Sequence, residues 1–186
     1  MGYALAEAAL NAGARTTLIS GPVHCEAAPG VEVVQVETTK EMLEASIAAG
    51  DGADIFIGAA AVVDFKPETI ATEKIKRAGS ESMELKLVSN PDIIATIATS
   101  DTRPKLVVGF AAETNDVTAY ARDKLQRKNL DFIFANDVSN DAIGFNSDSN
   151  AGTLISADNE MAMAMSSKRV LAETIISELA IHLAEK

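Results

Sequence analysis

Short β-rich runs alternate with helical segments along this chain, and no other feature of the sequence constrains its fold as strongly. An alanine-rich stretch over 1–10 predicts a helix that Gly13 ends. β-rich runs follow at 15–20, 31–36, 54–58, 106–111 and 131–135, and the alanines at 59–61 are expected to continue the third of them. Strands that alternate with helices form a mostly parallel sheet covered on both faces. The sequence therefore predicts one doubly wound α/β domain over 1–186.

Capping residues mark where several helices are expected to begin. Asn90 suits an N-cap, with Pro91 at the first helical position and Asp92 at the second. A further helix is expected over 116–128. Near the carboxyl end, strands at 152–156 and 161–165 are expected to form a hairpin, which adds an antiparallel edge to a Rossmann-like sheet. The other expected caps are Thr38 or Thr39, for a helix to about residue 49, and Ser166 or Ser167, for one to about residue 183.

Two stretches lack a sustained apolar period. Residues 66–82 are polar, which predicts an exposed, mobile flap loop, and a strand over 83–88 is expected to return from it. Residues 136–150 predict a long polar loop. Ligands of doubly wound sheets bind beyond the carboxyl ends of the strands. We therefore expect the site in the loops after Gly58, Phe110 and Asn136.

Composition narrows the possible functions. The net charge of −11 argues against a nucleic-acid-binding surface, and no apolar run approaches the roughly 20 residues that a membrane span needs. The single cysteine, Cys25, excludes an internal disulfide and, with no signal-peptide pattern at the start, favours the cytoplasm. An anionic ligand would need local clusters of lysine and arginine in so acidic a chain.

Two basic clusters occur. Residues 74–77 (KIKR) lie on the flap, where they either bind phosphates or form a solvated basic turn. Lys124 and Lys128 are four residues apart and share one face of a predicted helix, with Arg122 and Arg127 nearby. Cations at the end of a helix also complement its dipole, which is a sufficient structural explanation.

Small residues and an acid follow the strand at 54–58. Gly58, Ala59 and Ala60 let a ligand approach the backbone, and Asp64 offers an acceptor for a base amine or a ribose hydroxyl. The structural alternative is tight packing beside a surface aspartate. Phe110 ends another predicted strand, where its ring either stacks on a ligand or fills the core.

Taken together, the motifs of this chain are more specific than any one of them. They are GAAAVVDF (58–65), EKIKR (73–77), NPDII (90–94), VGFAAETN (108–115), RKNLD (127–131), ANDV (135–138) and GFNSDSN (144–150). In this order and spacing they resemble phosphopantothenoylcysteine synthetase, the phosphopantothenate–cysteine ligase of coenzyme A biosynthesis. In most bacteria that family forms the C-terminal half of a bifunctional protein, behind an FMN-dependent phosphopantothenoylcysteine decarboxylase.

The resemblance implies a two-step ligase reaction. CTP activates the carboxylate of 4′-phosphopantothenate as an acyl-cytidylate and releases pyrophosphate, and the amine of cysteine then displaces CMP. Mg²⁺ accompanies the triphosphate. Members of the family are homodimers in which the flap reaches towards the partner subunit.

The resemblance also implies roles for individual residues. Lys74 matches the first lysine of the family's flap and is implied as the catalytic residue. No metal ligand from the protein is implied. The residues implied to bind CTP are Gly58, Ala59, Ala60, Asp64, Lys74, Asn90, Pro91, Asp92, Ile93, Phe110, Lys124 and Lys128.

The sequence departs from the family pattern in two places, and these departures leave alternative functions open. Arg77 stands where the family's flap has lysine, which keeps the charge and changes the hydrogen-bond geometry. The family's first strand, glycine-containing turn and asparagine-bearing segment precede the residues that match Met1 and Gly2, so the chain is expected to be N-terminally truncated. A catalytically incomplete CTP-binding fragment is therefore one alternative. An NAD(P)-dependent oxidoreductase is another, although no G-x-G-x-x-G motif follows a strand.

Overall fold

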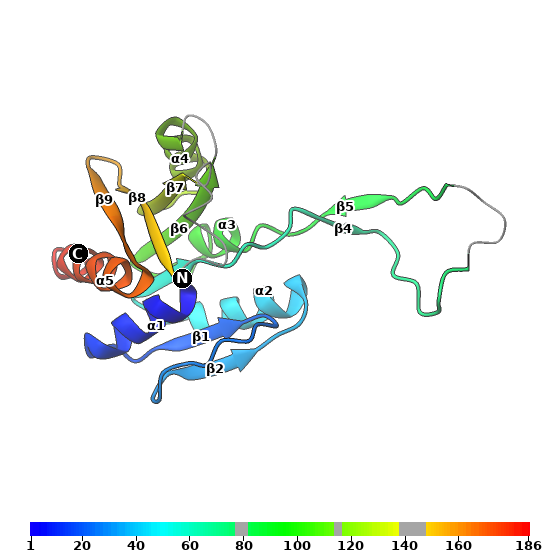
Figure 1. Ribbon diagram of the computed structural model, residues 1–186, viewed down its shortest axis with the longest axis horizontal. Helices are drawn as coiled ribbons and strands as arrows, with labels where there is room; N and C mark the ends of the chain where they lie inside the picture. The colour runs from blue at the N-terminus through cyan, green and yellow to red at the C-terminus, as the bar shows by residue number, and fades with distance from the viewer. Residues whose placement is uncertain (77–81, 114–116, 138–147) are drawn as a thin grey trace.

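The computed structural model describes residues 1–76, 82–113, 117–137 and 148–186 of the chain. Figure 1 shows a body of helices and strands from which one long arm projects. The described elements, in chain order, are α1 (Gly2–Asn11), β1 (Thr17–Ser20), β2 (Glu32–Gln35), α2 (Thr39–Gly50), β3 (Ile55–Gly58), β4 (Phe65–Pro67), β5 (Leu87–Ser89), α3 (Ile93–Ala98), β6 (Leu106–Glu113), α4 (Val117–Arg127), β7 (Phe132–Asp137), β8 (Ser149–Ile155), β9 (Glu160–Ser167) and α5 (Lys168–Ala184).

The central sheet is mixed, as the sequence predicts. Its five strands follow the order β3-β6-β7-β8-β9, with β3, β6 and β7 parallel and the hairpin of β8 and β9 antiparallel. β1 and β2 form a separate parallel pair. Within the described part of the chain, no strand joins β1 to β3. The predicted α/β fold with a C-terminal hairpin is confirmed, and its sheet is interrupted between these two strands.

Helices cover both faces of the central sheet. On one face, α1 and α5 pack over a core that includes Val108, Phe134 and Ile175. On the other face, α3 and α4 pack over a core that includes Val107 and Ile133. Side chains alternate between the faces of a strand, so neighbours in β6 serve different cores. No helix among the described residues is long and apolar enough to cross a membrane.

Local capping signals account for several helix boundaries. The side chain of Thr38 accepts from the amide of Glu41, whose own carboxylate accepts from the Thr38 amide, which completes a capping box at α2. Ser167 caps α5 in the predicted way. Gly13 follows α1 with φ of +90°, a conformation that favours glycine.

Several predicted boundaries are wrong. β6 continues to Glu113, so Phe110 lies within this strand and not at its end. β3 ends at Gly58, and the alanines at 59–61 do not extend it, because the chain leaves the sheet there towards the arm. α3 begins at Ile93 with Asp92 as its N-cap, two residues later than predicted. Asn90 does not cap the helix, since its side-chain amide donates to the carbonyl of Val63 instead.

The arm is a two-stranded antiparallel ribbon of β4 and β5 that projects from the body (Figure 1). β4 takes up the first residues of the stretch predicted as a loop over 66–82, and β5 is shorter than the predicted strand at 83–88. Residues 77–81 of the predicted loop lie outside the described residues. In the second predicted loop, over 136–150, residues 136 and 137 belong to β7 and residues 149 and 150 to β8, so the predicted loop is too long at both ends. Residues 138–147 also lie outside the described part.

An ionic network fastens the amino ends of β6 and β7 to the end of the chain. The carboxylate of Asp131 accepts from Arg103 Nη2 and from Lys186 Nζ at 2.6 Å each, and from the Val107 amide at 2.8 Å. Lys186 Nζ also donates to the carbonyl of Lys105. Burial raises the pKa of the Asp131 carboxyl, but the hydrogen bonds from Lys186, Val107 and Arg103 outweigh it and hold that pKa below its ordinary value.

Candidate functional site

Gly58 and the two alanines after it lie at the carboxyl end of β3, as predicted. A Cβ on Gly58 would stand 2.9 Å from Cδ1, the end of the Ile94 side chain, so that side chain packs closely against glycine here. The packing explanation therefore holds for Gly58. Ala59 is half-buried against the α1–α5 core, and Ala60 is exposed. Ala59 and Ala60 thus form a small-residue rim beside the end of the sheet.

Asn90 joins the two chain segments at the root of the arm. Its amide N–H donates to the carbonyl of Asp64 at 2.8 Å, and its side-chain Nδ2 donates to the carbonyl of Val63 at 2.9 Å. Asn90 Oδ1 is buried and has no hydrogen-bond partner among the described residues. The Asp64 side chain is exposed, because only its backbone takes part in this contact. At the root of the arm, the exposed carboxylate of Asp64 therefore lies near the side-chain amide of Asn90, which its hydrogen bond holds in place.

Asp92 and Lys128 form an ion pair beside this root. Lys128 Nζ lies 2.8 Å from Asp92 Oδ2, and the other carboxylate oxygen of Asp92 accepts from the Ala95 amide at 3.1 Å. Burial raises the pKa of Asp92, but the hydrogen bonds from Lys128 and Ala95 more than offset it, so the pKa is lowered. A phosphate that bound Lys128 would therefore share the ammonium with Asp92. Lys124 lies one turn earlier on α4, on the same face.

Phe110 lies on the opposite face of the sheet from this ion pair. Its ring is half-buried against the α1–α5 core, with the centroid 5.3 Å from that of Phe134. β6 and β7 place these two residues opposite each other in register. The pairing of Phe110 with Phe134 is a feature that the sequence analysis missed, and the phenylalanines at equivalent places in two adjacent predicted strands were its only signal.

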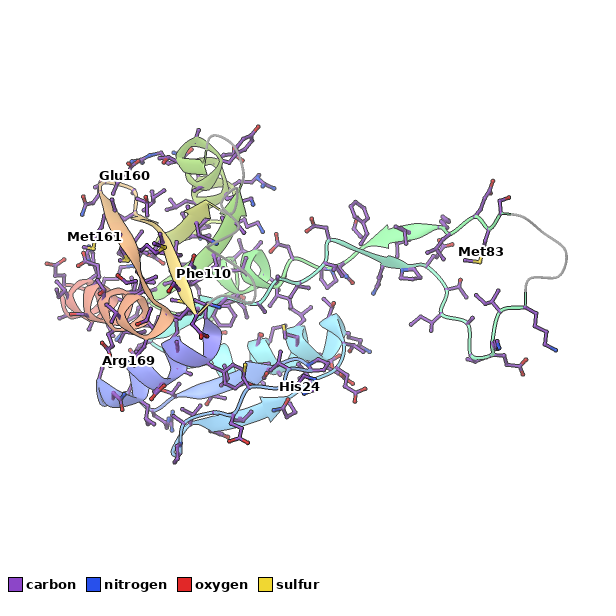
Figure 2. The ribbon with its side chains drawn as sticks, in the orientation of Figure 1. His24, Met83, Phe110, Glu160, Met161 and Arg169 are labelled. Carbon is purple, nitrogen blue, oxygen red and sulfur yellow. The ribbon has the colours of Figure 1, made fainter. Side chains whose placement is uncertain are left out.

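The predicted site residues do not form one cluster in space. Asp64, Asn90, Asp92 and Lys128 are brought together by contacts at the root of the arm, where Pro91 is exposed and Ile93 is buried. Lys74 is exposed and lies between β4 and β5, in the segment that forms the far end of the arm (Figure 1). Figure 2 gives the same contrast through its labels, with Met83 far out on the arm and Phe110 in the body. The arm of this chain does not bring Lys74 to the other predicted residues.

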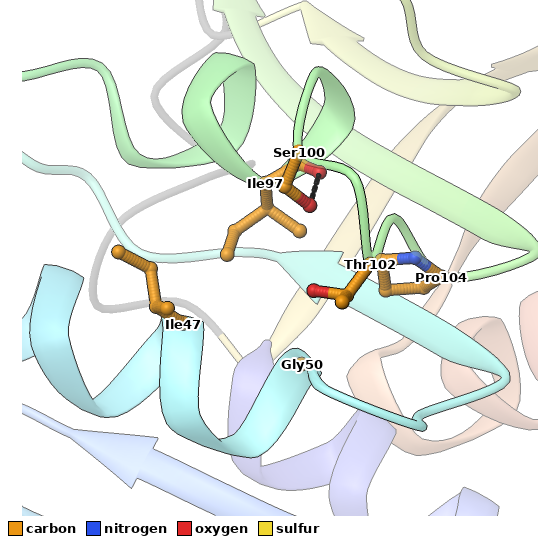
Figure 3. A pocket seen from close by; sticks show the side chains of 6 residues that line it. All are labelled: Ile47, Gly50, Ile97, Ser100, Thr102 and Pro104. Carbon is orange, nitrogen blue, oxygen red and sulfur yellow. Dashed lines mark hydrogen bonds between the residues drawn. The ribbon is translucent and has the colours of Figure 1, made fainter.

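A small hollow elsewhere on the body contains none of the predicted site residues. It lies between α2 and the segment from α3 to β6, and its volume is about 20 Å³, which is near the room that one water molecule needs. In Figure 3, the Ser100 hydroxyl donates to the carbonyl of Ile97 at its edge. The residues that line it are Ile47, Gly50, Ile97, Ser100, Thr102 and Pro104. A nucleotide does not fit this hollow.

Comparison with known proteins places the chain in a family. The family model described as the DNA/pantothenate metabolism flavoprotein C-terminal domain matches residues 1–182. The coenzyme A biosynthesis bifunctional protein CoaBC of Vibrio parahaemolyticus is 49% identical over 180 residues, which cover 96% of this chain and 45% of that protein. The CoaBC of Escherichia coli K12 is 46% identical over 188 residues, which cover 100% of this chain and 46% of that protein.

A solved structure agrees with these relatives. The crystal structure of the C-terminal domain of CoaBC superposes with a TM-score of 0.82 at 32% identity, over 100% of this chain and 83% of that one. The chain spans a little under half the length of the curated relatives it matches. The resemblance to the phosphopantothenoylcysteine synthetase domain is confirmed by these matches. The chain belongs to the family of DNA/pantothenate metabolism flavoprotein C-terminal domains, the family of the C-terminal half of CoaBC.

Proposed function

We propose that this chain is the ligase domain that joins 4′-phosphopantothenate to cysteine with CTP. In the first step a carboxylate oxygen of phosphopantothenate attacks the α-phosphorus of CTP, and pyrophosphate leaves. In the second step the cysteine amine attacks the acyl carbon, loses a proton and expels CMP. The observation that carries the proposal is the 49% identity to a CoaBC protein across nearly the whole chain.

The residues at the root of the arm suit a nucleotide. Lys128 and Lys124 are proposed to contact the phosphates. The ammonium group of Lys128 would then interact with a phosphate and with Asp92 at the same time. The exposed carboxylate of Asp64 is proposed to accept from the ribose hydroxyls. Phe110 is proposed to stack on the cytosine ring, and Gly58, Ala59 and Ala60 to lie against the nucleotide. Lys74 is proposed to stabilise the charge that develops while pyrophosphate leaves.

Mg²⁺ is proposed to enter with the triphosphate. The structure describes no group of three His, Cys, Asp or Glu side chains that could hold a metal ion, within the ranges it covers. Mg²⁺ commonly keeps several waters and binds through one carboxylate together with substrate phosphates. The ion would offset the negative charges of the two anionic substrates.

We further propose that the chain is a homodimer formed through the arm. Phe65 and Leu87 lie on one face of the ribbon, because paired residues in the register Phe65–Ser89 and Pro67–Leu87 point the same way. Leu85 and Met83 continue that apolar spacing, and all four side chains are at least half exposed. Apolar surface of this extent on a projecting ribbon needs a partner. A second copy supplies one, and the cations of the arm would then meet an acidic body.

Replacing Leu87 by glutamate is expected to weaken the dimer by at least about tenfold, since the change puts a charge in the proposed apolar interface. Sedimentation equilibrium of the variant and the parent measures this. The matched control is Lys86→Ala, which alters the neighbouring residue on the opposite face, where Lys86 pairs with Glu68 at 2.6 Å. A Leu87→Glu variant that associates as tightly as the parent would contradict the interface.

The relatives suggest a second domain for the natural protein. They are named as bifunctional, and this chain matches 45–46% of their length. We propose that an FMN-dependent decarboxylase domain accompanies the ligase and that the protein works in the cytoplasm. In that arrangement the product of the ligase, phosphopantothenoylcysteine, is the substrate of its neighbour.

The proposed function is tested by pyrophosphate release from CTP and 4′-phosphopantothenate in the absence of cysteine. We expect release from the parent chain and a loss of about 10²-fold or more in Lys74→Gln, because that change removes a charge that acts on the leaving group. The variant is expected to fold like the parent, since Lys74 is exposed. Equal release from both chains would contradict the role of Lys74.

The same experiment separates the ligase from a CTP-binding fragment. The interruption of the sheet between β1 and β3 is the observation that favours a fragment, because an incomplete sheet can bind CTP and still lack part of the catalytic site. A fragment would release no pyrophosphate, yet CTP would raise its melting temperature in proportion to the logarithm of CTP concentration. If NADPH raised the melting temperature and CTP did not, the result would favour the oxidoreductase over both the ligase and the CTP-binding fragment.

A further inference from the structure

The ring of Phe110 is held by one neighbour in particular. Phe134 stands opposite it on β7, and the two rings are tilted by 43° with their centroids 5.3 Å apart. Phe134 is completely buried, whereas Phe110 is only half-buried at the rim of the core. The edge of a fixed aromatic ring favours one tilt of a ring beside it. The orientation that Phe110 presents to a ligand therefore depends on where Phe134 lies.

The position of Phe134 depends in turn on a glycine in β8. A Cβ on Gly152 would lie 2.7 Å from Phe134 Cζ and would also meet the carbonyl oxygen of Ala135. The ring of Phe134 thus occupies the space that any other residue at 152 would fill. β8 has a register irregularity between Asn150 and Gly152, which lies at this crossing. Gly152 on β8 and Phe134 on β7 thus form a chain of contacts across two neighbouring strands that ends at Phe110 on β6.

We propose that Phe134 is a positioning residue for the nucleotide base, acting through Phe110, and that Gly152 keeps Phe134 in place. The inference rests on the proposed function, in which Phe110 stacks on cytosine. Stacking needs the ring plane fixed before the ligand arrives, because ordering a half-buried side chain on binding costs entropy. A smaller side chain at 134 frees the ring of Phe110 and weakens CTP binding without touching the nucleotide.

The test compares Phe134→Leu with Phe132→Leu. Phe132 lies two residues earlier on the same strand and face, is buried in the same core, and contacts the ring of His182 in place of Phe110. The two variants therefore lose the same atoms from the same core. We expect calorimetry to show CTP binding weakened roughly 2- to 10-fold in Phe134→Leu and unchanged in Phe132→Leu. In the enzyme assay the KM for CTP should rise, with the KM for cysteine unchanged.

A double variant makes the result decisive. Phe110→Leu combined with Phe134→Leu should bind CTP no more weakly than Phe110→Leu alone. Equal weakening by Phe132→Leu and Phe134→Leu, or additive losses in the double variant, would overturn the inference. Unchanged CTP binding in Phe110→Leu would also overturn the inference. If the parent chain nevertheless released pyrophosphate, the proposed ligase function would still hold.

Discussion

Replacing Asp131 by asparagine is expected to lower the free energy of unfolding by about 3 kcal/mol at pH 7. The carboxylate has a side chain only 17% exposed and accepts from Arg103, Lys186 and the Val107 amide. Asparagine has the shape of aspartate without its charge, so Arg103 and Lys186 would lie beside a neutral side chain. Asparagine also has only one oxygen, so at least one of the three donors would face its NH₂ group and lose its hydrogen bond. Urea unfolding followed by circular dichroism measures the change.

A neighbouring ion pair provides the control. Lys105 and Asp54 lie 2.7 Å apart, but both side chains are 59% exposed. Water and salt screen such a pair, so Asp54→Asn is expected to cost no more than about 0.5 kcal/mol. The two aspartates precede β3 and β7, the parallel strands on either side of β6, so the two sites differ mainly in the burial of the ion pair. Equal losses in the two variants would show that the Asp131 network does not stabilise the fold in the manner described.

The pH dependence gives the prediction a second, independent check. The pKa of Asp131 is lowered in the folded chain, so the folded state binds its proton less readily than the unfolded state. Its stabilisation is therefore complete above the unfolded pKa of about 3.9 and is lost as the pH falls through the lower, folded value. The stability difference between the parent and Asp131→Asn should be constant from pH 7 to about 5 and should shrink below pH 4.

The elements of this fold were predictable wherever their cause is local. The capping box at Thr38, the cap at Ser167 and the hairpin of β8 and β9 each depend on residues close together in sequence. The start of α3 was not predictable in this way. Asn90 and Asp92 are both good caps, and a hydrogen bond from Asn90 to distant Val63 decides between them. A tertiary contact of this kind leaves no local signal.

The candidate site was predictable in its residue types but not in its arrangement. The sequence pattern places Phe110 on a strand and predicts its end too early, and the contact of Phe110 with Phe134 depends on the register of β6 and β7. Spacing puts Lys124 and Lys128 on one face, but the ion pair of Lys128 with Asp92 depends on how α4 packs beside α3. The distance of Lys74 from the body has the same origin, since an exposed basic loop can fold back or project.

Because Lys74 lies far from the body of its own chain, the largest change in activity is expected in dimers made of two different variants. Lys74 lies on the arm, far from the body residues of its own chain, and the arm is proposed to reach a second copy. Each active site would then combine the body of one subunit with the arm of the other. Asp64→Ala damages the body side of the site, and it spares the arm root because Asn90 bonds to the backbone of Asp64. Dimers of Lys74→Gln alone, or of Asp64→Ala alone, are expected to be nearly inactive.

A purified heterodimer of these two variants is expected to recover about half the activity of the parent dimer. One of its sites joins the intact body of the Lys74→Gln subunit to the intact arm of the Asp64→Ala subunit, and the other site carries both defects. If the arm served its own body, each site would carry one defect and no activity would return. Differently tagged subunits, purified in two affinity steps and assayed for pyrophosphate release, distinguish these results. Recovery of activity therefore requires that the arm acts across the dimer, and its absence would mean that the arm folds back onto its own chain.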